Sequence, residues 1–259
     1  MAYNVKSLVA GVAFATAAFS MSAQAATVVD VELSLLVDVS GSVNATEFAL
    51  QRDGYVNAFN SGAIQSAIFD TTGGRVGKIA VNFVLWSGAA QQSVAVDWTL
   101  IEDVTSATAF ATAVSGVGQV FSGRTAPGSA INFATPLFAS NDFDGAFQVI
   151  DVSGDGPQND GADTSDARDA ALAAGIDRIN GIAIGDDTLL AWYQANIVGG
   201  TNGFALQAAT FADFNDAVAK KIEAEITGTN PVPLPAAAWL LISGLGAIGA
   251  MGWRRRAAA

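Results

Sequence analysis

An apolar run, Val31–Val37, ends abruptly in a short polar loop, and this junction constrains the fold more than any other stretch of the sequence. The run is rich in valine and leucine, as expected of a strand that is buried on both faces. Directly after the loop, Asn44 and Glu47 form a pair that is typical of a helix start, a capping side chain followed three positions later by a carboxylate. The stretch therefore predicts a buried strand, a loop and a helix, which together are the basic unit of an α/β protein.

Apolar segments with the spacing of strands alternate with amphipathic helical segments along the rest of the chain. The connector between the second and third strands is short, which indicates an antiparallel hairpin. The alternation as a whole predicts an α/β fold over residues 28–227: a doubly wound, mostly parallel sheet with helices on both faces and one antiparallel edge strand. After the first strand and the helix at 45–59, we expect strands at Ile79–Trp86, Ser93–Trp98, Phe147–Val152 and Ile179–Ile184, and a short apolar segment at Phe204–Leu206. We expect further helices at 106–115, from the glycine-rich loop at 123–128 to about Ser140, at 165–174, at 188–196 and from Thr210 onward.

The loop after the first strand carries three side chains with oxygen donors, Asp38, Ser40 and Ser42. Open α/β sheets bind their ligands beyond the carboxyl ends of the strands, which is where this loop is expected to lie. One carboxylate and two hydroxyls suit a hard cation such as Mg²⁺ better than a soft metal. The same residue types are also common in ordinary turns. The loop alone is therefore consistent with either a cation site or a plain turn.

Two later loops offer further ligands at equivalent places in the predicted topology. Thr125 lies in the glycine-rich loop 123–128, and Asp155 follows the strand at 147–152. The spacing D-x-S-x-S, with this threonine and aspartate, resembles the metal-ion-dependent adhesion site (MIDAS) of von Willebrand factor type A domains. The order of elements resembles that family across the whole predicted domain.

The resemblance implies a function as well as a fold. It implies that Asp38, Ser40, Ser42, Thr125 and Asp155 hold a divalent cation, with the hydroxyls bound directly and at least one carboxylate acting through water. It further implies that an acidic group of a bound protein or matrix ligand completes the coordination. Mg²⁺ is the expected ion, with Mn²⁺ and Ca²⁺ as alternatives.

Other acidic residues have simpler expected roles. Asp151 lies inside a predicted strand, so its side chain should face the layer that covers the sheet, as a helix cap or in a buried hydrogen bond. Asp160, Asp163 and Asp166 would suggest a second, calcium-type site, but their spacing is not that of an EF-hand. We therefore expect them to lie in a solvated loop.

The composition argues against catalysis. The chain has no histidine and no cysteine, which excludes Ser-His-Asp triads, the usual zinc ligands and disulfides. The first strand and loop also resemble those of haloacid-dehalogenase phosphatases, but the second carboxylate of that family would fall at Ser40, and no lysine lies in a matching late loop. Neither Ser40 nor Ser42 has a visible base. We predict a binding protein that is not an enzyme. The alternatives are a structural surface or matrix protein whose ion only stabilises the fold and, last, a metal-dependent phosphohydrolase.

The first 25 residues have the features of a secretory signal peptide. Lys6 precedes an apolar run from Leu8 to Phe19, and Ser22–Ala25 has small residues at the positions that signal peptidase recognises. The apolar run is short for a membrane span. The protein is therefore expected to be exported, with cleavage after Ala25.

The C-terminal end resembles a protein-sorting signal. A polar linker with the motif Val-Pro-Leu-Pro-Ala (228–235, continuing into Ala236) precedes an uncharged transmembrane segment at 236–253 and a basic cytoplasmic tail at 254–259. This arrangement resembles the VPLPA variant of the PEP-CTERM signal. The resemblance implies an exosortase as processing partner and at least transient contact with the membrane. The expected location is the cell surface or extracellular matrix of a Gram-negative bacterium, with the C-terminal segment as an alternative permanent anchor.

The charge of the chain excludes one class of partner. The net charge is −12, and Lys6 and Arg254–Arg256 at the two ends are among only 12 basic residues. The predicted domain between the ends is therefore still more acidic than the whole chain. Such a surface repels nucleic acids and attracts divalent cations, so no nucleic-acid partner is expected.

Overall fold

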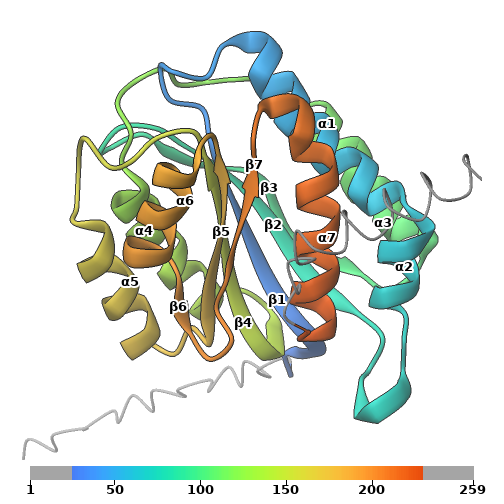
Figure 1. Ribbon diagram of the computed structural model, residues 1–259. Helices are drawn as coiled ribbons and strands as arrows, with labels where there is room; N and C mark the ends of the chain where they lie inside the picture. The colour runs from blue at the N-terminus through green and yellow to red at the C-terminus, as the bar shows by residue number, and fades with distance from the viewer. Residues whose placement is uncertain (1–24, 230–259) are drawn as a thin grey trace, which may run out of the picture.

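One sheet between two layers of helices makes up the described part of the computed structural model, residues 25–229 (Figure 1). Apart from Ala25, the predicted signal peptide lies outside these residues. So do the predicted transmembrane segment at 236–253, the basic tail at 254–259 and all but the first two residues of the linker at 228–235. Within residues 25–229, no helix has both the length and the apolar character needed to cross a bilayer.

The sheet has the strand order β3-β2-β1-β4-β5-β6, with β7 also paired to β5. Neighbouring strands are parallel except for the pairs β2–β3 and β5–β6, which are antiparallel. The strands are β1 (Thr27–Asp38), β2 (Ile79–Trp86), β3 (Gln92–Ile101), β4 (Phe143–Gly154), β5 (Arg178–Ile184), β6 (Gly199–Gly200) and β7 (Ala205–Ala208). The predicted α/β class and the antiparallel edge strand, β3, are confirmed.

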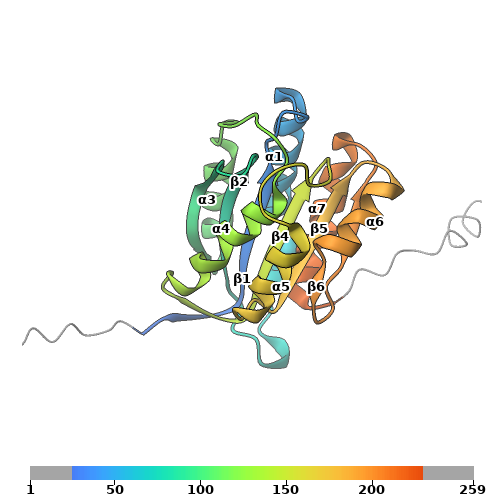
Figure 2. The same cartoon turned by 90° about the vertical axis from the view of Figure 1, so that its left-hand side faces the viewer.

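Helices cover both faces of the sheet, as Figures 1 and 2 show. One face carries α1 (Ala45–Asn60), α2 (Gly62–Ile68), α3 (Val104–Ser115) and α7 (Phe214–Thr227). The other carries α4 (Pro127–Ala139), α5 (Thr164–Ala173) and α6 (Asp187–Asn196). Two short 3₁₀ turns, Thr72–Gly74 and Phe211–Asp213, complete the regular structure of residues 25–229.

The central strand β1 explains why the sheet is buried on both sides. Leu33, Leu35 and Val37 belong to the core beneath α1, α3 and α7, whereas Leu36 belongs to the core beneath α4, α5 and α6. All four side chains are inaccessible to solvent. A largely apolar run is therefore what this position in the sheet requires, and the two polar side chains within it, Glu32 and Ser34, are buried as well.

The structure differs from the sequence-based expectation in short elements. The helix α2 and the two-residue strand β6 were not expected, and the last helix begins with a 3₁₀ turn at Phe211 before α7 itself starts. Ser61 explains α2: it ends α1, and its hydroxyl accepts a hydrogen bond of 3.2 Å from Ile64 N, so one residue both closes a helix and caps the next. Elements this short carry too few residues to show a periodic pattern.

Candidate metal centre

The carboxyl end of β1 places Asp38 in the interior, beneath the first loop. Its Oδ1 accepts a hydrogen bond of 2.7 Å from Ser40 N, a turn that aspartate favours. The loop then enters α1 through the predicted capping box, in which Asn44 Oδ1 accepts from Glu47 N (3.1 Å) and a Glu47 carboxylate oxygen accepts from Asn44 N (2.9 Å). Local sequence therefore fixes both ends of this loop.

Asp155 closes the site from β4. Ser42 Oγ donates a hydrogen bond of 2.6 Å to Asp155 Oδ1, and Ser40 Oγ lies 3.1 Å from Ser42 Oγ. Gly154, at the end of β4, leaves room for Asp38: a Cβ at this position would lie only 2.7 Å from Asp38 Oδ2. Four of the five predicted ligands thus gather in one place.

Thr125 approaches the same segment from the third loop. A Cβ on Gly156, the residue after Asp155, would lie 3.8 Å from Thr125 Oγ1. Asn159 holds the threonine there, because its Oδ1 accepts from Thr125 N (2.9 Å) and its own backbone N donates to Thr125 O (2.9 Å). Thr125 is itself nearly buried, at 5% exposure.

Hydrogen bonds also tie the first loop to the threonine loop. Gly41 N donates to Gly123 O at 2.8 Å, and Gln119 Nε2 donates to Val43 O at 2.9 Å. Ser87, just beyond β2, accepts from Gly123 N at 2.8 Å. The three loops therefore form one connected structure at the carboxyl ends of β1, β2 and β4, which is the upper edge of the sheet in Figure 1.

Among residues 25–229, no lysine or arginine forms an ion pair with the buried carboxylate of Asp38. The side chain is fully buried, and Oδ2 has no hydrogen-bond partner among the described residues. Burial raises the pKa of Asp38 from 3.8 to about 7. An orphaned, buried carboxylate oxygen beside two serine hydroxyls and a second carboxylate is an arrangement that a bound cation would satisfy. The residues present therefore fit a divalent cation.

Asp155 differs from Asp38 in its access to solvent. Its side chain is only half-buried, and Ser42 is exposed. Burial, with a smaller contribution from the negative charge of Glu47, raises the pKa of Asp155, while the hydrogen bond from Ser42 acts in the opposite direction. The candidate site is therefore closed beneath Asp38 and open on the side of Asp155.

The donor set contains more hydroxyls than carboxylates. Within residues 25–229, no group of three or more histidine, cysteine, aspartate or glutamate side chains gathers in a way that could hold a metal ion. The aspartates at 160–166, which we expected to lie in a solvated loop, belong to no such group among residues 25–229. Asp163 instead caps α5 by accepting from Asp166 N (3.0 Å), and Asp160 Oδ2 accepts from Ala89 N (3.0 Å).

Asp151 takes no part in the three loops. Its side chain faces the covering helix α7, where Lys221 Nζ lies 2.5 Å from Asp151 Oδ1 and 2.5 Å from Glu225 Oε1. All three side chains are buried. Asp151 therefore faces the covering layer, as expected, and its buried contact there is an ion pair with Lys221 rather than a helix cap. Burial raises the pKa of Asp151 to about 7, although the charge of Lys221 opposes this.

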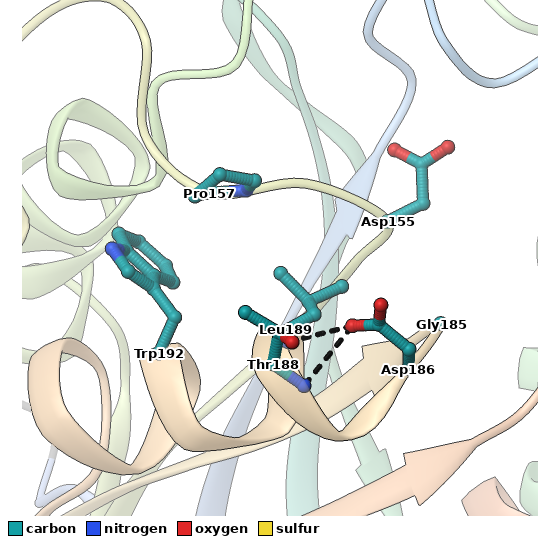
Figure 3. A pocket seen from close by; sticks show the side chains of 7 residues that line it. All are labelled: Asp155, Pro157, Gly185, Asp186, Thr188, Leu189 and Trp192. Carbon is teal, nitrogen blue, oxygen red and sulfur yellow. Dashed lines mark hydrogen bonds between the residues drawn. The ribbon is translucent and has the colours of Figure 1, made fainter.

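A hollow of about 480 Å³ adjoins the candidate site on the far side of Asp155 (Figure 3). Trp192, Leu189 and Pro157 give it an apolar lining, while the carboxylate of Asp155 points away from Trp192. Asp186 caps α6 at its edge and accepts from Leu189 N at 3.1 Å. Apolar surface therefore lies directly beside a set of hard oxygen donors.

Sequence reasoning missed the residues that hold the ligands in place. Ser87 and Asn159 lie in loops that were expected, but their bonds to the threonine loop join segments more than 30 residues apart, and nothing local indicates such pairs. Nor does the sequence indicate that the Tyr193 hydroxyl lies beside Gly154, where a Cβ would be 2.8 Å from its oxygen. The helical spacing of Tyr193 indicates only a core residue.

Solved structures share this fold at low sequence identity. Proximal thread matrix protein 1 from the mussel byssus matches with a TM-score of 0.56 and 17% identity, over 79% of this chain and 50% of that one. A structure of the same matrix protein with a zinc-occupied MIDAS motif matches with a TM-score of 0.54 and 14% identity, over 78% and 49%. The pilus adhesin SpaC from Lactobacillus rhamnosus GG matches with a TM-score of 0.55 and 14% identity, over 79% and 32%. This chain thus spans half or less of each of these proteins, and the likeness is one of fold.

Sequence comparison places the chain in a family. No curated protein matches it. The family model described as "Protein of unknown function (DUF1194)" matches residues 28–230, which is most of the chain. The match includes every residue that the structure describes except 25–27. The chain belongs to the DUF1194 family, and its fold is that of a von Willebrand factor type A domain.

Proposed function

We propose that this protein is an exported surface or matrix protein that binds a protein or matrix ligand through a divalent cation. The cation would be Mg²⁺, with Mn²⁺ and Ca²⁺ as alternatives. Asp38, Ser40, Ser42, Thr125 and Asp155 would hold it. One observation carries the proposal: Asp38 is buried with one carboxylate oxygen unpartnered, and its other oxygen begins a chain of contacts through Ser40 and Ser42 to Asp155.

The donor set determines what such an ion would do. Two carboxylates and three hydroxyls leave a divalent cation less neutralised than a carboxylate-rich cage would. The ion would therefore supply an electrophilic position for an oxygen ligand of the partner, and a carboxylate is the group that suits a hard cation best. Ser42 is exposed and Asp155 half-buried, so a partner could reach this side.

The accessible side of the site favours binding over a purely structural ion. A structural site would be expected to be closed by the protein's own acidic loop. Here the nearby acids Asp160 and Asp163 are occupied with Ala89 N and the start of α5 instead. The hollow lined by Trp192, Leu189 and Pro157 offers room for the residues that flank the ligand's acidic group.

The structural neighbours are consistent with this role. One is a thread matrix protein that has been solved with zinc in its MIDAS motif, and another is a pilus adhesin. Export through the predicted signal peptide, sorting by an exosortase and location at a Gram-negative cell surface are parts of the same proposal. The proposal also includes a role in binding rather than in catalysis. Because the chain is acidic, it includes no nucleic-acid partner.

Water proton relaxation with Mn²⁺ tests the proposal without knowledge of the ligand. A bound Mn²⁺ ion that keeps exchangeable water should enhance relaxation when the full chain is added, and excess Mg²⁺ should reverse the enhancement. Polyglutamate, used as the acidic probe, should displace that water and reduce the enhancement. Asp38→Ala should show no enhancement. An unaltered signal on adding wild-type protein would contradict cation binding, and indifference to polyglutamate would contradict the open position.

A further inference from the structure

Tyr193 on α6 is a fully buried tyrosine whose hydroxyl has no hydrogen-bond partner among the described residues. Burying a hydroxyl without a partner is unfavourable, and phenylalanine would fill the same space without that penalty. The ring packs within the core formed by α4, α5, α6 and the sheet, where it contacts Trp192 edge to face. Packing explains why an aromatic ring occupies this position, but it does not explain why the ring carries a hydroxyl group.

Two glycines form a slot for this side chain. A Cβ on Gly181 of β5 would lie 2.6 Å from Tyr193 Cδ1, and a Cβ on Gly154 of β4 would lie 2.8 Å from the Tyr193 hydroxyl oxygen. Real side chains do not approach so closely, so both positions need glycine for the tyrosine to fit. Gly181 admits the ring and Gly154 admits the hydroxyl, which fixes where the hydroxyl lies.

The hydroxyl faces the candidate metal centre. The same point above Gly154 lies 2.7 Å from Asp38 Oδ2, the carboxylate oxygen that also lacks a partner. An unpaired donor and an unpaired acceptor therefore lie within 2.8 Å of the same point above Gly154. Burial, followed by the negative charge of Asp38, raises the pKa of Tyr193 well above its ordinary value, so the hydroxyl keeps its proton.

We propose that Tyr193 is a positioning residue for the cation site, whose hydroxyl donates to Asp38 Oδ2 through one water and so orients the Asp38 carboxylate. This inference rests on the proposed cation-binding function. Groups that orient a metal's ligands typically change its affinity by about 10- to 100-fold when they are removed. Tyr193 touches no ion itself; it acts through Asp38.

The test compares Tyr193→Phe with Tyr55→Phe in the full chain. Tyr55 is the other fully buried tyrosine of residues 25–229, and its hydroxyl donates a hydrogen bond of 3.2 Å to Ser153 Oγ. Mn²⁺ and Mg²⁺ affinities are measured by calorimetry, and melting temperatures are measured in EDTA. Tyr193→Phe should weaken cation binding by about 10- to 100-fold, with a melting temperature in EDTA that is unchanged or higher. Tyr55→Phe should lower the melting temperature and leave cation affinity within about twofold of wild type.

The outcomes separate this inference from the proposed function. Wild-type protein that binds neither ion contradicts both. Wild-type protein that binds, together with a Tyr193→Phe variant of equal affinity, overturns the role of Tyr193 alone. A fall in the EDTA melting temperature of Tyr193→Phe as large as that of Tyr55→Phe would show that the hydroxyl stabilises the fold, and would also overturn the inference.

Discussion

Ser42 and Asp155 are 113 residues apart in the chain, yet the serine hydroxyl donates a hydrogen bond of 2.6 Å to the aspartate carboxylate. This contact joins the loop after β1 to the loop after β4, two strands that are neighbours in the sheet. Gly154, on one side of Asp155, leaves space for Asp38, and Gly156, on the other side, lies within van der Waals reach of Thr125. One short segment, Gly154–Gly156, therefore meets the ligands from both of the other loops.

The stability of the metal-free protein should fall as the pH rises from about 4 to about 7. The folded state keeps a proton on Asp38, whose pKa is raised from 3.8 to about 7, whereas the unfolded chain releases it. Since the folded state then binds more protons, a rise in pH favours unfolding in this window. Asp151, with its pKa also raised to about 7, acts in the same direction. Thermal melts in EDTA from pH 4 to pH 8 measure the effect.

Asp38→Asn should remove part of that pH dependence. Asparagine keeps an oxygen to accept from Ser40 N but carries no charge to bury. At pH 8 in EDTA, the variant should be more stable than wild type by on the order of 3 kcal/mol, and at pH 4 the two should be alike. Parallel pH profiles for the two proteins would contradict the buried, uncompensated state of Asp38.

Gly154→Ala should disturb the site and the fold together. The added methyl group would lie 2.7 Å from Asp38 Oδ2 and 2.8 Å from the Tyr193 hydroxyl oxygen, so one of them has to move. Overpacking of this kind costs about 1–3 kcal/mol, and the displaced carboxylate should bind cations more weakly. Gly62→Ala is the matched control, because nothing lies within 4 Å of its Cβ and it begins a helix. Equal melting temperatures and equal Mn²⁺ affinities for both variants would count against the close approach at Gly154.

Lys221→Met should destabilise the protein without touching the cation site. The substitution leaves Asp151 and Glu225 buried without their cation, a loss of about 3–5 kcal/mol. Lys220→Met, one residue away on the exposed side of α7, should change the free energy of unfolding by less than about 0.5 kcal/mol. Urea unfolding in EDTA compares the two. If both variants unfold at the same urea concentration as wild type, the buried ion pair contributes nothing.

The junction of β1 and α1 could be predicted because its signals are local. An apolar run predicts the buried strand, and Asn44 and Glu47 predict the helix start; the structure has both. The five candidate ligands followed from loops at strand ends, together with a resemblance in their spacing. That they hold a metal stays a prediction, as do the domain bounds 28–227 and the sorting signal.

Contacts between distant segments could not be predicted. The helical pattern does not distinguish Lys221, which is buried, from Lys220, which is exposed. Only the packing of α7 on the sheet buries Lys221 against Asp151. Tyr193 and Gly154 are likewise ordinary core and turn residues until α6 is placed on the sheet. The sequence pattern assigns residues to faces, whereas the partner of a buried polar group depends on which faces meet.

A thermal melt of the full chain tests the central claim most directly, first in EDTA and then with Mg²⁺, Mn²⁺ or Ca²⁺ restored, for wild type and Asp38→Ala. A cation at about a hundred times its dissociation constant should add about 2.7 kcal/mol of stability, which raises the melting temperature by roughly 5–10 °C. The account predicts this rise for wild type and its absence in Asp38→Ala. No rise with any of the three ions, or an equal rise in the variant, would contradict a cation site at Asp38.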